Sequence, residues 1–252
     1  MWRVLTERAR QKHRTFDYPR LPPVLPDRFR GRPAVDGAPV AEAEALVDKC
    51  PTGALTADAD KRLRLDMGKC LFCGECERAS GGRGIRFSKD HRLAATRRED
   101  LVAAGGVENT AAALRSEAAR LFGHSLKLRQ VSAGGCNACE ADVNVLNTLV
   151  YDLGRFGIQF VASPRHADGL LVTGPVTRNM ELALMKTYKA VPTPKIVIAV
   201  GACAISGGLY ADHDQTRSGV GGILPVDLFI PGCPPHPWTI LDGLLRFLGR
   251  LP

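Results

Sequence analysis

Cysteine is the residue whose number and spacing in this sequence point most directly to chemistry. The chain has 252 residues and eight cysteines, four in its first third and four in its second half. They are Cys50, Cys70, Cys73 and Cys76, followed by Cys136, Cys139, Cys203 and Cys233. Each group has the four thiolates that one iron–sulfur cluster takes as ligands. Because no cysteine is left over, the count favours two such clusters and hence electron transfer.

The composition indicates a folded chain in a reducing compartment. Apolar residues make up 45% of the sequence, which is enough for a sizeable core. The first 14 residues are charged throughout and lack the apolar run of a secretory signal. The longest apolar stretch, 196–205, is much shorter than the ~20 residues of a membrane span. We therefore expect a cytoplasmic protein with no transmembrane helix of its own.

The formal net charge is +8, and the basic residues are concentrated between Arg3 and Arg32. Two clusters, each with four thiolates, would lower this charge to about +4. The basic segment fits contact with an acidic subunit or with anionic lipid headgroups, and a solvated arm is an equal alternative. Binding to nucleic acid is disfavoured, because no recognition helix or aromatic platform accompanies the charge.

Three other uses of the cysteines remain open. Disulfides are disfavoured in a reducing compartment, where C-x2-C spacing points to metal or redox chemistry. Zinc also takes four thiolates, but zinc ribbons usually pair two C-x2-C knuckles and the second group has only one. Buried, inert thiols are the third alternative.

Strand and helix signals alternate through the second half of the sequence. Apolar runs predict strands at 126–131, 158–161, 170–172, 196–200 and 226–230. Helical periodicity predicts a helix from Asn109 or Thr110 to Phe122, and further helices at 141–153, 178–190 and 237–248. This alternation is typical of a parallel sheet that is covered by helices on both faces.

The second cysteine group lies where these strands end. Cys136 and Cys139 follow the first predicted strand, Cys203 follows the fourth and Cys233 the fifth. The carboxyl ends of parallel strands meet at one edge of a sheet, so distant cysteines can surround one cofactor there. The neighbouring glycines allow the backbone to approach a bulky cluster closely.

The motifs around these cysteines resemble one protein family. They are Gly134-Gly135-Cys136-Asn137-Ala138-Cys139-Glu140, Ser163-Pro164-Arg165-His166-Ala167-Asp168, Thr173-Gly174-Pro175-Val176-Thr177, Gly201-Ala202-Cys203-Ala204 and Pro231-Gly232-Cys233-Pro234-Pro235. In order and spacing they resemble the family shared by the 20-kDa subunit of respiratory complex I and the small subunit of membrane-bound, energy-converting (group 4) nickel–iron hydrogenases.

This resemblance implies a flavodoxin-like sheet and a 4Fe–4S cluster held by the second cysteine group. It also implies a hydrogenase-like large subunit as partner, together with other ferredoxin and membrane-arm subunits. Complex I subunits carry adjacent cysteines at the first motif, whereas the hydrogenase branch carries C-x2-C, as this chain does. A hydrogenase complex is therefore the favoured interpretation. A complex I-like NADH or ferredoxin:quinone oxidoreductase, with the cluster next to a quinone site, is the alternative.

The first cysteine group resembles a bacterial ferredoxin motif. Cys70, Cys73 and Cys76 match its three-cysteine core, and Cys50-Pro51 is similar to its fourth-ligand element. The resemblance covers about residues 15–90 and implies a small α+β domain with a 4Fe–4S cluster of its own; a zinc knuckle is the alternative. The ligand places of the second ferredoxin cluster hold Val40, Ala43, Leu46 and Ser80. We expect side chains to fill that cavity.

These observations predict an α/β protein of two domains. Residues 1–105 would form a Pro/Arg-rich arm and a ferredoxin-like 4Fe–4S domain, and residues 106–252 the domain that resembles the complex I and hydrogenase subunits. The chain would be an oxidoreductase subunit that relays electrons through two 4Fe–4S clusters, with the catalytic centre in a partner. Its expected place is peripheral, on the cytoplasmic face of the cell membrane.

A few residues near the second group are weaker candidates. Glu140 directly follows Cys139 and is either a proton relay to a neighbouring metal site or a cap of the helix that starts there. Arg165 and His166 either tune the cluster or border a quinone headgroup, or else His166 and Asp168 hold their loop in place. His236 is either a hydrogen-bond donor near the cluster or a surface residue.

Overall fold

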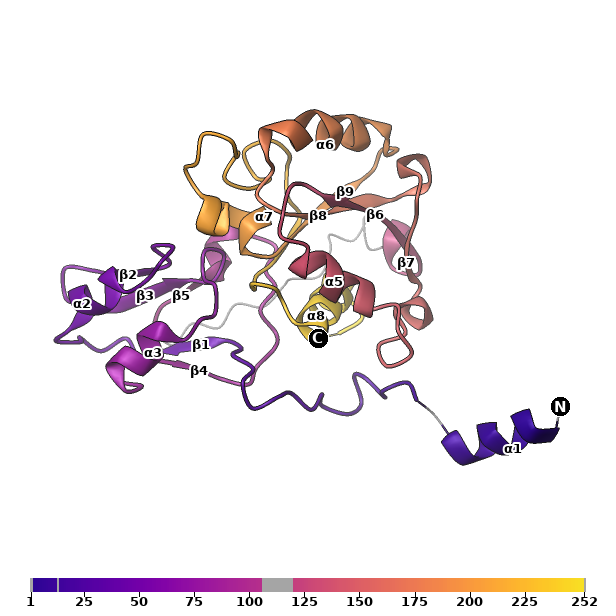
Figure 1. Ribbon diagram of the computed structural model, residues 1–252, viewed down its shortest axis with the longest axis horizontal. Helices are drawn as coiled ribbons and strands as arrows, with labels where there is room; N and C mark the ends of the chain where they lie inside the picture. The colour runs from indigo at the N-terminus through magenta and orange to yellow at the C-terminus, as the bar shows by residue number, and fades with distance from the viewer. Residues whose placement is uncertain (1, 13, 106–119, 252) are drawn as a thin grey trace.

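The second half of the chain forms a five-stranded parallel sheet in the computed structural model, which describes residues 2–12, 14–105 and 120–251 (Figure 1). Its strands are β6 (Leu126–Ser132), β7 (Ile158–Phe160), β8 (Gly169–Thr173), β9 (Ile196–Val200) and β10 (Leu228–Ile230). The order across the sheet is β7-β6-β8-β9-β10, which is the 2-1-3-4-5 order of flavodoxin. The predicted flavodoxin-like α/β fold is confirmed.

Helices cover both faces of this sheet, as the alternating pattern predicted (Figure 1). They are α5 (Ala138–Val145), α6 (Arg178–Ala190), α7 (Ala202–Ser206) and α8 (Pro237–Phe247). On one face, α5 and α8 share a core cluster with residues of β6, β9 and β10. On the other face, α6 and α7 pack against the opposite side of the strands. Every residue of β8 and β9 is buried, which explains why both read as unbroken apolar runs.

One predicted helix is shorter than expected. The apolar spacing predicted a helix over 141–153, whereas α5 ends at Val145 and a 3-10 helix, η2 (Leu153–Phe156), follows after a turn. Leu146 and Leu153 are both buried, but Leu149 is 70% exposed, and Leu153 N donates to Leu146 O at 3.0 Å. The chain therefore reverses between two buried leucines instead of continuing as a helix. Of the helix predicted to start at Asn109 or Thr110, residues up to 119 lie outside the described residues, and 120–122 are helical.

The first half of the chain forms a small α+β unit. It contains an antiparallel pair, β1 (Pro33–Val35) with β4 (Ile85–Phe87), and a three-stranded sheet of β2 (Leu55–Ala57), β3 (Leu63–Asp66) and β5 (Val102–Ala103). Helices α2 (Ala43–Asp48) and α3 (Glu75–Ser80) complete it, and helix α1 (Trp2–Gln11) lies apart at the amino terminus (Figure 1). Val40, Ala43 and Leu46 are buried in the core of this unit, and Ser80 is buried as well. The residues at the expected ligand places of a second ferredoxin cluster are therefore packed inside this unit, which is consistent with the prediction that side chains fill that site.

The two parts of the chain share contacts and core. Ala95 forms an antiparallel bridge with Phe229 of β10, with N to O distances of 3.0 and 2.8 Å. A short 3-10 helix, η1 (Arg98–Leu101), brings Leu101 into the core of the parallel sheet. The proposed domain boundary at residue 105 therefore separates two parts that pack against each other.

Tyr18 joins the amino-terminal arm to α8 through a buried polar network. Its hydroxyl donates to Asp242 Oδ1 at 2.7 Å, and Arg246 Nε donates to Asp242 Oδ2 at 2.9 Å. His91 Nε2 lies 3.4 Å from the same hydroxyl. Burial lowers the pKa of His91, and this effect exceeds the opposing one of the nearby carboxylates. The charged groups that act on His91 are Asp242 and Asp90, which raise its pKa, and Arg92 and Arg246, which lower it.

We expect His91 to make the fold less stable as the pH falls. Because its folded pKa is depressed, its stabilising contribution is complete above its unfolded pKa of about 6.5 and is lost as the pH falls below that value. Thermal unfolding of the full chain under argon, at pH values on either side of about 6.5, measures the effect. His91→Gln should flatten the dependence, and His124→Gln at an exposed position should not. An unchanged slope in His91→Gln would contradict the prediction.

Candidate metal centres

The second cysteine group gathers at the carboxyl edge of the parallel sheet, as predicted. Cys136 and Cys139 follow β6, Cys203 lies in α7 directly after β9, and Cys233 follows β10. Two backbone bonds tie the last two loops together. Gly201 N donates to Ile230 O at 2.8 Å, and the next amide along the chain donates to Gly232 O at 2.9 Å.

The four thiols of this group are electrostatic neighbours. Burial raises the pKa of Cys139, and Glu140 and the other three thiols raise it further. Burial likewise raises the pKa of Cys203 to about 11, with contributions from Cys233 and Cys136. Each thiolate that forms in this group makes the ionisation of its neighbours less favourable, because their negative charges repel one another. A bound cationic core supplies the opposite charge and holds its thiol ligands deprotonated.

Two glycines leave the space that the sulfurs occupy. Gly201 has a φ of +90°, and a Cβ at this position would lie 2.6 Å from Cys139 Sγ. A Cβ at Gly208 would lie 3.0 Å from Cys203 Sγ. Only a residue without a side chain fits at Gly201, because both its backbone conformation and its distance to sulfur exclude a Cβ. The backbone at Gly201 and Gly208 therefore passes close to the sulfurs of Cys139 and Cys203, which leaves room for a bulky ligand on their other side.

The first cysteine group lines one small cavity of the α+β unit. The cavity is walled by all four of its cysteines together with Leu65, Leu71 and Phe87. Phe72 N donates to Cys70 Sγ at 3.2 Å, and hydrogen bonds of this kind tune the potential of iron–sulfur clusters. Burial raises the pKa of Cys70 to about 12, opposed by the Phe72 amide and reinforced by the other three thiols.

Both donor sets fit iron–sulfur clusters. Each has four thiols, and each shows a close backbone approach to sulfur. Within the described ranges, no three His, Cys, Asp or Glu side chains converge on a point that a single metal ion could occupy. In a 4Fe–4S cluster each thiolate binds a different iron, so the ligand sulfurs stand further apart than around one ion.

A cavity lies between the loop of the first cysteine group and Cys233 of the second. Leu71 and Phe72, from the loop of the first group, line it together with Gly232, Cys233 and neighbouring prolines of the second group. Phe72 also packs against the cores of both parts of the chain. Arg28 and Arg30 of the amino-terminal arm also line this cavity. The loop between Cys70 and Cys73 is thus the element of the first group that lies nearest the second.

Glu140 is buried beside the second group, in the first turn of α5. Asn137 occupies the capping position of α5, with no side-chain capping bond. The Glu140 side chain instead accepts hydrogen bonds at Oε1 from Ser132 Oγ and Thr173 Oγ1, both at 2.6 Å, and the residue is 6% exposed. Glu140 does lie in the first turn of α5, where the helix dipole favours an acid, as the second interpretation expected. The hydroxyl partners come from β6 and β8, which nothing near Glu140 in the sequence indicated.

Arg165 and His166 lie at the opposite end of the sheet from these cysteines, in the 3-10 helix η3 (Pro164–His166). Asp168 N donates to Lys127 O at 2.7 Å, and Asp168 Oδ2 accepts from Lys127 N at 2.7 Å, at the start of β6. The five residues from there to the end of β6 span about 17 Å. The prediction that Arg165 and His166 tune the cluster is wrong. Asp168 holds the loop in place, as the other interpretation proposed.

The reason for this error is the short strand β7, which pairs only with Leu126–Leu128 at the amino end of β6. The loop after it therefore never reaches the carboxyl edge. His236 caps α8, a role that the sequence did not predict. Its Nδ1 accepts a hydrogen bond from Trp238 N at 3.2 Å. Pro237 at the first helical position was the signal that could have revealed it.

The chain resembles known proteins over its second half. Residues 136–247 match the family described as NADH ubiquinone oxidoreductase, 20 Kd subunit. The probable membrane-bound hydrogenase subunit mbhJ of Pyrococcus furiosus is 43% identical over 132 residues, which are 52% of this chain and 79% of that protein. This chain belongs to that family.

Two further relatives show both branches of the family. Formate hydrogenlyase subunit 7 of Escherichia coli is 41% identical over 145 residues, 58% of this chain and 57% of that protein. An NADH-quinone oxidoreductase subunit of Desulfovibrio desulfuricans is 41% identical over 112 residues, 44% of this chain and 61% of that protein. These relatives are named as subunits of oxidoreductases, so the recognised family is confirmed. The second cysteine group lies within the matched residues and the first lies outside them.

Proposed function

We propose that this chain is the electron-transfer subunit of a membrane-associated hydrogenase complex. Cys50, Cys70, Cys73 and Cys76 would hold one 4Fe–4S cluster, and Cys136, Cys139, Cys203 and Cys233 would hold a second. The observation that carries the proposal is the arrangement of all eight cysteines in two groups: four around one cavity, and four that lie close enough to raise one another's pKa. When bound, each cluster would take up and release an electron, and the reaction with hydrogen would belong to a nickel–iron large subunit.

The residues of this chain would supply spacing and insulation. Leu71 and Phe72 place apolar side chains between the first group and Cys233. Gly201 and Gly208 let the backbone close over the sulfurs of the second group. Solvent exposure and hydrogen bonds to sulfur both set cluster potentials, so these contacts would determine the direction in which electrons run.

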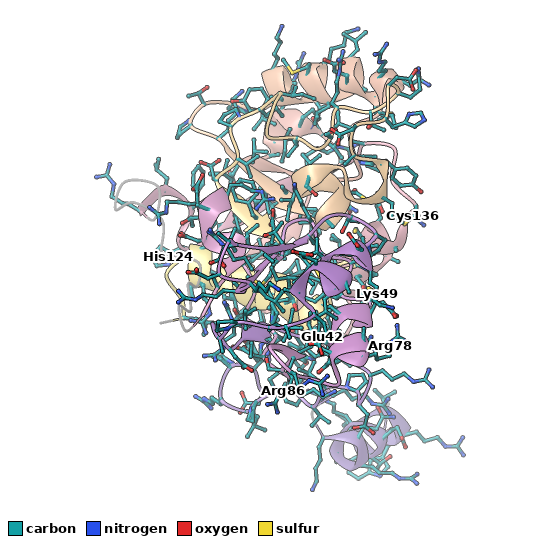
Figure 2. The ribbon with its side chains drawn as sticks, turned by 90° about the vertical axis from the view of Figure 1, so that its left-hand side faces the viewer. Glu42, Lys49, Arg78, Arg86, His124 and Cys136 are labelled. Atoms are coloured by element: carbon teal, nitrogen blue, oxygen red, sulfur yellow. The ribbon has the colours of Figure 1, made fainter. Side chains whose placement is uncertain are left out.

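The large subunit would dock where the second group opens to the surface. Cys136 and Cys233 are exposed, and Figure 2 shows Cys136 at the edge of the molecule, on the same side as Lys49 and Arg78. Beside Cys203, the short helix η4 (Gly208–Tyr210) exposes Leu209 and Tyr210 by 59% and 47%. Other ferredoxin and membrane-arm subunits would complete the assembly.

The expected place of the chain is peripheral, on the cytoplasmic face of the membrane. The printed names of its relatives include a membrane-bound hydrogenase subunit, which supports a site near the bilayer. In the parts of the chain that the structure describes, no helix is long and apolar enough to cross a membrane.

Anaerobic purification tests the proposal. The full chain should contain about eight iron and eight sulfide ions, in the two four-iron sets that its thiols can hold. The complex isolated with its partners should contain nickel and should evolve hydrogen from a reduced electron carrier. A colourless chain that holds only zinc would overturn the electron-transfer role. Iron without nickel or hydrogen activity would remove the hydrogenase assignment alone.

A quinone-linked oxidoreductase is the second candidate function. It is favoured by the 41% identity to a subunit of an NADH-quinone oxidoreductase. The C-x2-C spacing of Cys136 and Cys139 argues for the hydrogenase branch instead. The large-subunit sequence separates the two: two C-x2-C pairs that could bind nickel support the hydrogenase, and their absence together with quinone reduction supports the alternative.

Glu140→Gln tests the proton relay proposed for Glu140. The amide oxygen can still accept from Ser132 and Thr173, so we expect unchanged cluster content and stability. Hydrogen turnover of the complex should fall by about 10²-fold, because the amide cannot carry the proton. Glu140→Ala is the structural comparison: it removes the acceptor shared by the buried Thr173 hydroxyl and the exposed Ser132 hydroxyl and should destabilise the fold by about 1 kcal/mol. Full activity in Glu140→Gln would exclude the relay.

A further inference from the structure

Every residue of helix α1 is exposed. None of its residues is buried, and it stands away from the remaining elements in Figure 1. Its side-chain bonds stay within the helix and the residue that follows it: Thr6 Oγ1 donates to Arg3 O, Gln11 Nε2 to Glu7 Oε1, and Arg8 Nη1 to Lys12 O. A ten-residue helix of this kind is marginal in water alone, so a surface that receives it would stabilise it.

The residues of α1 divide into an apolar stripe and a basic border. At about 100° per residue, Trp2, Leu5 and Ala9 fall within about 60° of one another. Arg8 borders this stripe on one side, and Arg3 and Arg10 border it on the other. Glu7, the one acidic residue between positions 2 and 14, lies nearly opposite the stripe. Val4 also lies outside it.

This arrangement matches the interface of an anionic membrane. An interfacial helix places a tryptophan-containing apolar face among the lipid chains, and the arginines beside it reach the headgroups. The region from Arg3 to Arg14 carries five basic residues against one acidic residue. Each such charge near an anionic leaflet strengthens binding by about fivefold. Tryptophan itself prefers the membrane–water boundary.

The point where α1 joins the rest of the chain also carries exposed apolar side chains. Phe16 N donates to Val150 O at 3.0 Å, so only the few residues from Lys12 to Thr15 separate the helix from this anchor. Leu149 and Val150 at the anchor are 70% and 45% exposed. The apolar stripe of α1 is therefore tethered close to an exposed apolar pair on the folded body.

We propose that α1 lies in the headgroup region of a membrane rich in anionic phospholipid and holds the chain at that surface. The inference rests on the proposed peripheral location and names the element responsible for it. It needs no cluster, so its failure and that of the electron-transfer role can be told apart.

Vesicle flotation of the full chain tests this inference. The chain should float with phosphatidylcholine vesicles that contain about one third phosphatidylglycerol, and should not float with pure phosphatidylcholine vesicles. Replacing Arg3, Arg8 and Arg10 together by glutamine should lower the partition coefficient at least about tenfold. Leu5→Ser should have a similar effect. Val4→Ser is the matched control outside the stripe and should change the coefficient less than about twofold.

Tryptophan fluorescence gives a second readout. The sequence has two tryptophans, and Trp238 is 4% exposed in the core, so a blue shift on adding anionic vesicles should come from Trp2 and vanish in Trp2→Phe. The proposal is overturned if the chain ignores anionic vesicles, if Val4→Ser and Leu5→Ser weaken binding equally, or if pure phosphatidylcholine binds as well. Retention by an acidic partner protein without any vesicle binding would also overturn it.

Discussion

A chain that carries Cys203→Ser is expected to lose one of its two iron–sulfur signals and about half of its iron. The serine hydroxyl ionises far less readily than a thiol, so it is a poor ligand in place of a thiolate. Cys73→Ser should produce the complementary loss, because Cys73 belongs to the other cavity. Electron paramagnetic resonance of the reduced chain, with iron and sulfide assays, measures both effects. In the complete complex, either variant should abolish most of the electron flow to hydrogen.

Ser80→Ala is the control for this pair. Ser80 stands in a ligand place of the second ferredoxin cluster and is buried, and we infer that side chains fill that site. Its replacement should leave both signals intact. Unaltered spectra in Cys73→Ser and Cys203→Ser would refute the assignment of the two groups, and loss of both signals in each single variant would show that the groups are not independent.

Gly201→Ala should remove the second cluster and leave the first. The added Cβ would lie 2.6 Å from Cys139 Sγ, closer than non-bonded atoms approach, and the φ of +90° is one that alanine rarely adopts. The conformation alone costs on the order of 1–2 kcal/mol, and relief of the overlap must move either a ligand sulfur or the loop after β9. We therefore expect loss of about half the iron and a lower midpoint of thermal unfolding.

Gly221→Ala is the matched glycine control. A Cβ there would meet no heavy atom within 4 Å, and its φ lies outside the strained region. Its iron content, spectra and thermal midpoint should equal those of the unaltered chain. If Gly201→Ala behaved in the same way, the close backbone approach that we describe around Cys139 would have no role in holding the cluster.

The strands and helices of the second half could be predicted because their signals are local. The strand at 196–200 and the helix at 178–190 were predicted with the bounds of β9 and α6, since a buried strand needs an unbroken apolar run and a surface helix needs a stripe. Cysteines that directly follow such strands must meet at one edge of the sheet. The family could be recognised for the same reason: each of its motifs is a short, continuous loop that can be found in the sequence alone.

Contacts between distant segments could not be predicted in this way. Nothing near Tyr18 in the sequence indicates its bond to Asp242, and nothing near Glu140 indicates Ser132 and Thr173 as its partners. The short pairing of β7 with β6 determined at which end of the sheet Arg165 and His166 lie. The approach of Leu71 and Phe72 to Cys233 likewise depends on how the α+β unit packs against β10.

The sequence by itself therefore determined the fold class, most elements of the second half and which cysteines follow its strands, because spacing along the chain encodes strand, helix and loop. The tertiary structure alone decided which loop of the first group faces Cys233, which hydroxyls bind the buried Glu140, and which helix of the described residues is exposed along its whole length. These depend on the packing of whole elements, whose relative positions result from many weak contacts between residues that are far apart in the chain.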